Sequence, residues 1–207
     1  MKGLIIRLYP TEKQKKILEN HFNITRCIYN LALETKIRCY QDYQVNLSRY
    51  DLQNQLPELK HNFPWIKDCK AECLQYTLLQ LDNAYKRFFK LKKGFPKFKS
   101  KYSKQSFTQN QHLIIDDTGI LFLGNKIKFK TSSEYQNLLK NIKIKKITYS
   151  KNNLGEYYAS ILIDFNHIQL PKIKNEIGVD LGLKYFLVTS NGDKIDNPKF
   201  LKKSEKD

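Results

Sequence analysis

After a short first strand, the spacing of the apolar residues changes at the tripeptide Gly94-Phe95-Pro96, and this change constrains the fold more than any other feature. Before it, apolar residues recur every three or four positions. The clearest case is the stripe Leu74, Leu78, Leu81, Tyr85 and Phe88, which is typical of a helix that packs along one face. Beyond it, apolar and polar residues alternate with the period of a β-strand. The sequence therefore predicts a block of helices followed by a block of strands.

The first block is predicted to contain one strand followed by helices. The strand is expected over residues 2–9, and helices are expected over residues 12–44, after a cap at Thr11. A short helix is expected from Ser48, and the longest helix from Asp68 to about Lys92. Pro10 ends the strand, and Pro57 is expected to disturb the short helix. Thr11 and Gln14 have the spacing of a capping box, in which each side chain binds the backbone of the other residue.

The second block is predicted to contain five or so short strands. Residues 112–130 contain three strands joined by Asp-Asp-Thr-Gly and Gly-Asn turns, and residues 141–165 form a hairpin about Asn152 to Gly155. A lone first strand, then helices, then further strands is the order that a helical insertion into a small β-barrel produces. The sequence therefore predicts an α+β fold.

Net charge indicates the class of partner. The formal net charge is +17, and residues 83–175 account for most of it, with 19 basic against 5 acidic residues. Residues 1–82 carry 12 against 9, and residues 176–207 carry 6 against 6. Such a local excess favours polyanions, above all nucleic acid. The middle of the chain therefore has the composition of a binding surface.

Residues 84–110 are the most informative part of that surface. No acidic residue occurs between Asp82 and Asp116, and aromatic residues are interleaved with the basic ones. Basic side chains neutralise phosphates, and aromatic side chains stack on unpaired bases. The other interpretation is a solvated basic face whose aromatic residues belong to the core, as the helical stripe indicates for Phe88. The candidate nucleic-acid-binding residues are Lys86, Arg87, Lys90, Lys92, Lys93, Lys97, Lys99, Lys101, Tyr102, Lys104, Ser106 and Phe107.

Two sets of alternating lysines could extend this surface along the strands. They are Lys126, Lys128 and Lys130 in one segment, and Lys143 and Lys145 in the other. A period of two places each set on one sheet face. Both a second basic surface and an ordinary solvated face fit this pattern.

An acidic residue follows an apolar run near the C-terminus. Residues 177–179 predict a strand that ends in a buried Asp180, followed by a tight turn and a second strand over residues 185–189. Metal-dependent phosphoryl-transfer folds of the ribonuclease-H type place their first carboxylate in such a position. Cleavage by two metal ions needs several converging carboxylates. The alternative is an aspartate that only forms a turn.

Cysteine content and hydropathy exclude several classes. The four cysteines form no CxxC pair, and with no suitable histidine nearby we expect reduced thiols and no zinc site. No apolar run approaches the roughly 18 residues that span a membrane, and the first ten residues do not resemble a signal peptide. A cytoplasmic protein without a membrane partner is expected.

Four ordered segments resemble the TnpB family of insertion-sequence proteins, the OrfB-type transposases. They are "LYPTEKQKKILENHF", "RCIYNLALE", "LDNAYKRFFK" with "GFPKFKSKYSKQSF", and "IGVDLGLKYFLVTSNGDKIDNPKFLKK". TnpB proteins are RNA-guided DNA endonucleases. The resemblance implies a wedge-type β-barrel (1–10 and 100–172), an inserted helical recognition domain with a helix-turn-helix-like start (11–99), and the first strands of a RuvC-like domain (173–207). It also implies guide RNA and DNA as partners.

The resemblance assigns Asp180 as the first RuvC carboxylate, a ligand of Mg²⁺. Only residues 181–207 follow it, whereas the family pattern continues with a Glu, a second Asp and paired CxxC zinc ligands. Asp193 and Asp196 do not occupy the family's catalytic positions. The magnesium site is therefore expected to be incomplete, and the chain is expected to be a C-terminally truncated TnpB-like protein whose C-terminal half is missing or separately encoded.

Two functions are consistent with these observations. The first is the N-terminal portion of a TnpB-like endonuclease that binds guide RNA and target DNA but does not cleave by itself. The second is a stand-alone nucleic-acid-binding or regulatory protein, derived from a transposon, that acts by occupying its target. A DNA-reading helix-turn-helix would need exposed basic or amide side chains on its second helix. Residues 12–44 instead place four apolar residues in a pattern typical of helix packing, namely Ile17, Ile24, Ile28 and Leu31.

Overall fold

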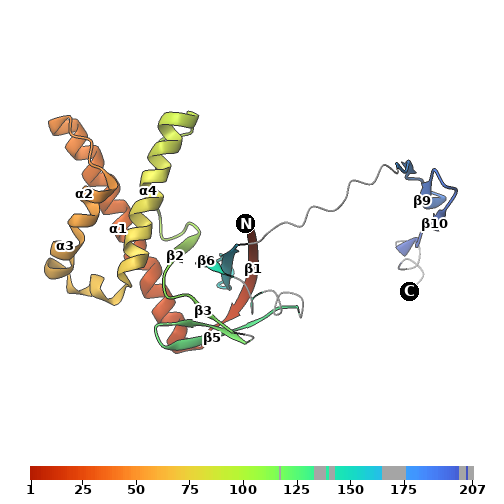
Figure 1. Cartoon of the computed structure of the whole chain (residues 1–207), viewed down its shortest axis with the longest axis horizontal. Coiled ribbons are helices and arrows are strands. Elements are labelled where there is room, and N and C mark those ends of the chain that lie inside the picture. The colour runs from red at the N-terminus through yellow and green to blue at the C-terminus, as the bar shows by residue number, and fades with distance from the viewer. Residues whose placement is uncertain (117, 133–138, 140–142, 165–175, 201–203, 205–207) are drawn as a thin grey trace. The chain divides into compact units, whose positions relative to one another are not determined.

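The computed structural model describes residues 1–116, 118–132, 139, 143–164, 176–200 and 204. The chain divides into two compact units, residues 1–166 and residues 167–207. The first unit contains a seven-stranded sheet and the helices, and the second contains a three-stranded sheet (Figure 1).

The first unit opens with strand β1 (Lys2–Tyr9) and helix α1 (Glu12–Tyr43). The predicted capping box is confirmed, because the Thr11 hydroxyl accepts from the Gln14 N–H while the Thr11 N–H donates to Gln14 Oε1. No Gly or Pro interrupts the 32 residues of α1, which ends at Gln44 in the left-handed conformation.

One sequence prediction about the helices is wrong. The longest helix is α1 and not the later helix, because the helical signal of residues 12–43 has no internal breaker. For the same reason residues 12–43 form one continuous helix. The helix-turn-helix-like start expected for the helical domain therefore has no turn within these residues.

Three short helical segments connect α1 to α4. They are α2 (Arg49–Asn54), α3 (Leu56–Asn62) and the 3₁₀ segment η1 (Pro64–Asp68), and α4 spans Ala71–Leu91. The Ser48 hydroxyl caps α2 by accepting from the Asp51 N–H, as expected. Pro57 lies in the first turn of α3, where backbone N–H groups have no acceptor within the helix. The absence of an N–H in proline therefore costs no hydrogen bond there, and Pro57 lies at the start of a new helix.

The strands of the first unit form one antiparallel sheet in the order β2-β6-β7-β1-β5-β4-β3. Their bounds are β2 Gln105–Gln109, β3 Ile114–Ile115, β4 Gly119–Phe122, β5 Asn125–Lys130, β6 Ile144–Lys151 and β7 Tyr157–Ile163. Strand β1 lies inside the sheet between β7 and β5, so the helices are an insertion between strands of one sheet. The predicted α+β class and hairpin β6–β7 are confirmed.

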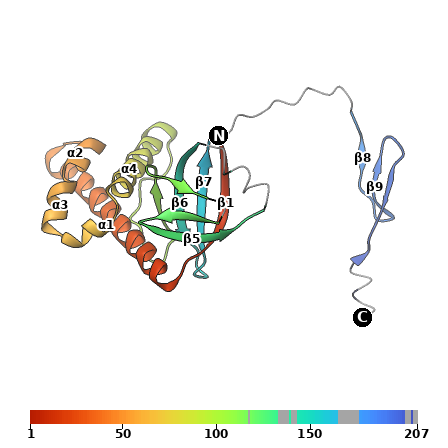
Figure 2. The ribbon, with the colours of Figure 1, turned by 60° about the horizontal axis from the view of Figure 1, so that its bottom comes forward.

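The sheet is curled, and helices α1 and α4 lie beside it (Figure 2). The described residues show no pairing between the edge strands β2 and β3, so over these residues the sheet is open and does not close into the predicted barrel. Helices and sheet share one core, in which Phe22 of α1 contacts Phe107 of β2. The expected boundary near residue 99 therefore does not separate two cores.

The second unit contains β8 (Val179–Asp180), β9 (Tyr185–Thr189) and β10 (Lys194–Asp196), paired antiparallel in the order β10-β9-β8. The predicted strand, turn and strand around Asp180 are confirmed, with Asp180 opposite Val188. None of the described residues of this unit is buried, however, and Asp180 is exposed. The expectation of a buried acid is wrong, because three short strands form a single layer that cannot bury a side chain.

Across the described part of the chain, no helix combines the length and the apolar character that crossing a membrane requires.

Candidate nucleic-acid interface

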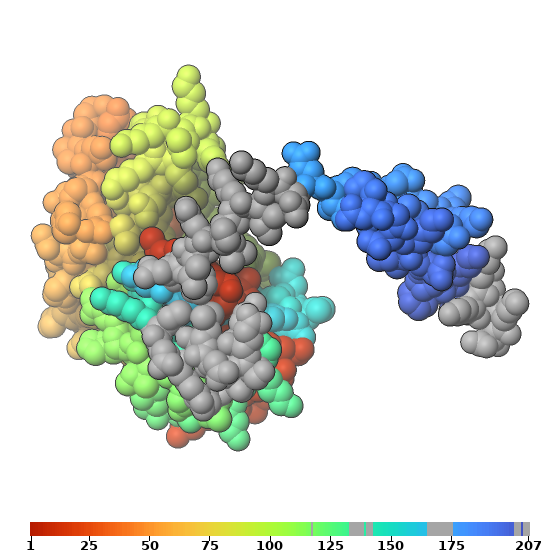
Figure 3. Space-filling model, turned by 45° about the vertical axis from the view of Figure 1, so that its right-hand side comes forward, coloured from red at the N-terminus to blue at the C-terminus, as the bar shows by residue number. Residues whose placement is uncertain are grey.

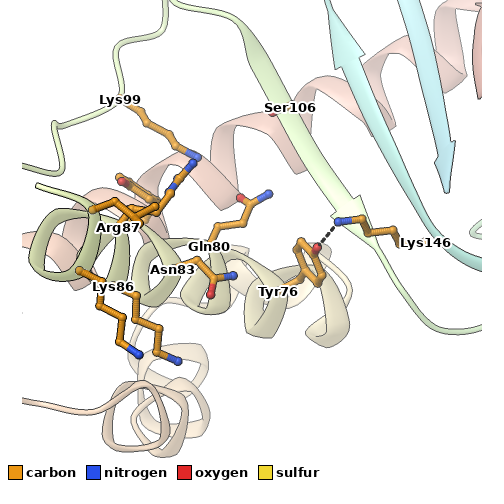
Figure 4. Close-up of a pocket in the computed structure, with 12 residues that line it drawn as sticks. Tyr76, Gln80, Asn83, Lys86, Arg87, Lys99, Ser106 and Lys146 are labelled. Carbon is orange, nitrogen blue, oxygen red and sulfur yellow. Dashed lines mark hydrogen bonds between the residues drawn. The ribbon is translucent and has the colours of Figure 1, made fainter. Parts of the chain in front are cut away.

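An open groove runs along α4, between this helix, the residues that follow it and the edge of the sheet (Figure 4). We call it the α4 groove. Its lining residues come from α1, α4, β2, β6 and the segment before β2, and they are Tyr29, Tyr76, Gln80, Asn83, Ala84, Lys86, Arg87, Lys90, Leu91, Lys99, Ser106 and Lys146. Five of these residues are basic and none is acidic. Amide, hydroxyl and aromatic groups complete a surface that suits a phosphodiester backbone.

Lys99 is held in the groove by two neighbours on α1. Its backbone N–H donates to Asn30 Oδ1 over 2.8 Å, and Asn30 Nδ2 donates to the Lys99 carbonyl over 3.0 Å. Its ammonium lies 4.1 Å from the centre of the Tyr29 ring, a cation–π contact. Burial lowers the pKa of Lys99, since desolvation disfavours the charged form.

Arg87 faces Lys99 across the groove. Figure 4 shows its guanidinium directed toward the Lys99 ammonium, whereas Lys86 extends away from it. Among the described residues, neither Arg87 nor Lys99 has a carboxylate partner, whereas Lys86 forms an ion pair with Asp82 at 2.8 Å. Two cationic side chains that face one another without a carboxylate partner favour the binding of an anion between them.

Lys146 enters the groove from β6. Its ammonium donates to the Tyr76 hydroxyl over 2.7 Å and lies 5.3 Å from the centre of the same ring. Neither residue was among the candidates from the sequence. Lys146 directly follows Lys145, and only the bulge between Ile144 and Lys146 sets which of them faces α4. Tyr29, Gln80 and Asn83 were also missed, because they lie on helices predicted only to pack.

The structure brings five of the twelve sequence candidates together in the α4 groove: Lys86, Arg87, Lys90, Lys99 and Ser106. Lys92, Lys93 and Lys97 are exposed beyond the end of α4 and do not line it. Lys101 and Tyr102 line a second hollow with Arg26 and Lys151 of neighbouring elements. Lys104 lies at two further hollows, one beside Ser106 and one beside Tyr158.

Two aromatic residues occupy other places than the sequence predicts. Phe107 is 1 % exposed and packs in the core against Tyr149, with ring centres 5.0 Å apart, so it cannot stack on a base. It points inward because it alternates along β2 with Ser106, which faces the groove. Phe88, expected in the core, is only half-buried, because the buried part of α4 ends at Leu81.

The alternating lysines lie on an exposed sheet face. Lys126, Lys128 and Lys130 alternate with the buried Ile127 and Phe129 along β5. Lys126 pairs with Asp116, and Lys145 pairs with Asp164 at 3.0 Å. These contacts favour the solvated-face interpretation for Lys126 and Lys145, because their charge is already neutralised.

The catalytic assignment of Asp180 finds no partner in the described residues. In those parts of the chain, no group of three or more His, Cys, Asp or Glu side chains lies close enough to hold a metal ion. Asp180 is one exposed carboxylate on a short strand. The described residues therefore do not fit a two-metal site, which needs several carboxylates.

Sequence comparisons link the chain to insertion-sequence proteins. The family model HTH_OrfB_IS605, described as a helix-turn-helix domain, matches residues 1–44. A protein of Streptomyces pristinaespiralis named "Putative RNA-guided DNA endonuclease" is 26% identical over 196 residues, covering 93% of this chain and 49% of that protein. "Putative RNA-guided DNA endonuclease InsQ" of Escherichia coli K12 is 22% identical over 207 residues, covering 97% of this chain and 50% of that protein.

One further relative covers less of this chain, and one solved structure is only distantly similar. "Virulence protein VsdF" of Salmonella dublin is 32% identical over 108 residues, which cover 47% of this chain and 91% of that protein. A chain of the solved structure "Cryo-EM structure of CRISPR-Cas12f Ternary Complex" aligns with a TM-score of 0.45 and 11% identity, over 95% of this chain and 51% of that one. This likeness is too distant to bear on the fold.

The two endonuclease relatives align along almost the whole of this chain, and the chain spans about half of their length. The family model covers the β1–α1 start, and the two alignments extend through the basic segment and the β8–β9 hairpin. From this agreement along the sequence, the chain belongs to the TnpB family.

Proposed function

We propose that this chain binds guide RNA and target DNA as the nucleic-acid-holding part of an RNA-guided DNA endonuclease. The observation that carries the proposal is the α4 groove, which gathers five basic side chains and no acidic one. Each basic side chain that contacts a phosphate releases condensed counterions, so such a groove favours a phosphodiester backbone. The names of the relatives agree with this chemistry.

Cleavage is not proposed for the described residues alone. Two-metal hydrolysis needs carboxylates that clamp both metal ions, and Asp180 has no such neighbours in the described parts of the chain. Asp180 remains a proposed ligand of Mg²⁺ in a site that further carboxylates would have to complete, from a longer protein or from a separately encoded C-terminal half.

The same observation favours a second candidate function. A protein that binds nucleic acid through the α4 groove and lacks a complete metal site could act by occupying its target. The two candidates share the groove and differ in whether cleavage ever follows binding.

The binding proposal is tested by the salt dependence of affinity. Anisotropy of a fluorescent RNA is measured over a series of salt concentrations for the wild type and for the double variant Arg87→Gln/Lys99→Gln. Each lost phosphate contact should reduce the slope of log K against log salt by about 0.7 to 0.9. The matched control is Lys13→Gln/Lys16→Gln, which removes two exposed charges of α1 outside the groove. Equal slopes for both double variants would refute the α4 groove as the binding site.

The cleavage proposal needs a separate assay. The purified chain, with any RNA that co-purifies, is incubated with plasmid DNA and Mg²⁺. No strand cleavage is expected. Nicking that Asp180→Asn abolishes would show that residues 1–207 form a working metal site and would exclude action by occupancy alone.

A further inference from the structure

Four aromatic side chains meet at the C-terminal end of α4, and none of them lines the α4 groove. We call Tyr85, Phe88, Phe89 and Phe95 the α4 aromatic cluster. Phe88 and Phe89 follow Tyr85 by three and four positions, so both lie on the same side of the helix as Tyr85. Phe95 joins them because the chain reverses at Lys92, whose φ of 49° is left-handed.

Part of this cluster has a structural role. The Phe95 ring meets Tyr85 at 5.5 Å and Phe88 at 5.3 Å, both nearly edge to face. Such a contact between a helix and the residue that follows it is usual where a helix ends in a left-handed residue. The end of α4 is therefore held by Phe95, Tyr85 and Phe88.

The contacts that hold this helix end do not require Phe89. Its side chain is 69 % exposed, and Phe95 is 45 % exposed, although Leu74 and Leu81 of the same helix are fully buried. Figure 3 shows the yellow-green end of α4 standing out at the surface of the first unit. Phe89 contacts Tyr85 and Phe88 on the cluster side. Exposed apolar groups gathered in this way mark a binding surface.

The charges around the cluster identify the partner. The helix end and the segment after it carry the cations Lys86, Arg87, Lys90, Lys92, Lys93 and Lys97, and the sequence has no acidic residue between Asp82 and Asp116. Among the described residues, Lys86 is the member of this set with an ion pair. Lys36 of α1 adds a further cation, 4.9 Å from the centre of the Tyr85 ring. A polyanion is therefore the complementary partner.

Aromatic rings beside cations are the combination that single-stranded nucleic acid requires. The backbone is held by charge, and unpaired bases stack on the rings regardless of their sequence. Bases inside a duplex already stack on one another and cannot reach a ring on a protein surface. We infer that the α4 aromatic cluster is a stacking site for unpaired bases, with Phe89 as its platform. The inference rests on the proposed function and extends it to residues outside the α4 groove.

The experiment compares Phe89→Leu with Phe89→Tyr on three fluorescent probes of equal charge. The probes are an unstructured single strand of about 16 nucleotides, an abasic strand of the same length, and a short duplex. Leu keeps the apolar bulk without a π face, whereas Tyr keeps the face. Phe89→Leu should weaken binding of the single strand about 5- to 100-fold and change the other two affinities less than about twofold. Phe89→Tyr should bind all three probes as the wild type does.

A matched control separates stacking at this site from a general effect of exposed aromatic residues. Trp65 of η1 is 46 % exposed and also contacts another ring, that of Phe63. Trp65→Leu should leave all three affinities unchanged. The Arg87→Gln/Lys99→Gln variant should weaken all three probes, because it removes charge and leaves the cluster intact.

The outcomes distinguish this inference from the proposed function. Loss confined to the groove variant, with Phe89→Leu equal to the wild type on the single strand, overturns the stacking site and leaves the groove standing. Equal losses of Phe89→Leu on the single strand, abasic strand and duplex overturn it as well, because they indicate disturbed folding or lost general contact. A wild type that binds none of the probes overturns both.

Discussion

Asn30 and Lys99, 69 residues apart in sequence, are joined by two reciprocal hydrogen bonds between the Asn30 side chain and the Lys99 backbone. One residue lies in the middle of α1 and the other in the segment that connects α4 to β2. The pair fixes the position from which the Lys99 side chain enters the α4 groove. A half-buried amide that satisfies both backbone groups of one residue holds that segment more firmly than packing alone.

Asn30→Ala should weaken nucleic-acid binding although Asn30 itself carries no charge. Both hydrogen bonds are lost, so the backbone N–H and C=O of Lys99 have no partner in α1. The backbone position from which the Lys99 side chain enters the α4 groove is then no longer held. We expect a loss of stability of about 1 to 3 kcal/mol and several-fold weaker binding in anisotropy. Asn62→Ala, at an exposed position of α3, is the matched control and should change neither quantity. Unchanged affinity in a folded Asn30→Ala variant would contradict the positioning role.

Truncation of the two aromatic residues Phe107 and Tyr102 should change the stability of the fold by very different amounts. Phe107 is buried among Phe22, Phe122 and Tyr149, so Phe107→Ala leaves a cavity and should cost about 3 to 5 kcal/mol in urea unfolding. Tyr102 is 81 % exposed, so Tyr102→Ala should stay within about 0.5 kcal/mol of the wild type. Similar losses for both would contradict the placement of Phe107 in the core.

These residues show what local sequence patterns can and cannot predict. The capping box of Thr11 and Gln14 and the hairpin about Asn152 depend on residues close in sequence, and both were predicted correctly. The α4 groove depends on which elements meet in space. Tyr29 and Lys146 enter it from α1 and β6, and nothing near either residue in the sequence indicates that they line the same groove as Lys99.

The placements predicted for Phe88 and Phe107 are wrong because one sequence pattern was extended past the point where the core or the secondary structure changes. The helical stripe of α4 continues past Leu81, where the core ends, so Phe88 belongs to a surface cluster. The basic segment continues into β2, where alternate residues face opposite sides, so Ser106 lines the groove while Phe107 enters the core. The strand period could have separated these two, had β2 been recognised as a strand.

The cap of α1 should contribute measurably to stability. Thr11→Ala removes the hydroxyl that accepts from the Gln14 N–H at the start of a 32-residue helix. We expect a loss of about 0.5 to 2 kcal/mol in chemical unfolding. Thr35→Ala deletes the same groups inside the same helix, where the hydroxyl only bonds back to the Leu31 carbonyl, and should be neutral or slightly stabilising. Equal losses at both positions would contradict a specific role of the cap.

His21 should make the fold sensitive to mild acid. Its side chain is 1 % exposed and packs against Phe107 and Phe122. Nδ1 lies 2.9 Å from the Ile17 carbonyl, which can only accept, so Nδ1 carries the hydrogen. Nε2 accepts from the Lys70 backbone N–H at 3.4 Å and must be unprotonated. Protonation of Nε2 would therefore break this contact.

Burial lowers the pKa of His21 below its ordinary value of 6.5, and nearby Lys70 lowers it further, against the opposing effects of the Ile17 carbonyl and Asp68. The unfolded chain then binds a proton at a higher pH than the folded one does. This contribution to stability is present above pH 6.5 and is lost as the pH falls toward the lowered pKa. The urea midpoint should therefore fall between about pH 7 and pH 5.

His21→Phe identifies the source of that pH dependence. Phenylalanine keeps an aromatic ring against Phe107 and Phe122 but does not titrate. At pH 7 it should be less stable by about 1 to 3 kcal/mol, because the Lys70 N–H loses its acceptor. Its urea midpoint should change much less between pH 7 and pH 5 than that of the wild type. An undiminished pH dependence in His21→Phe would assign the acid sensitivity to other groups.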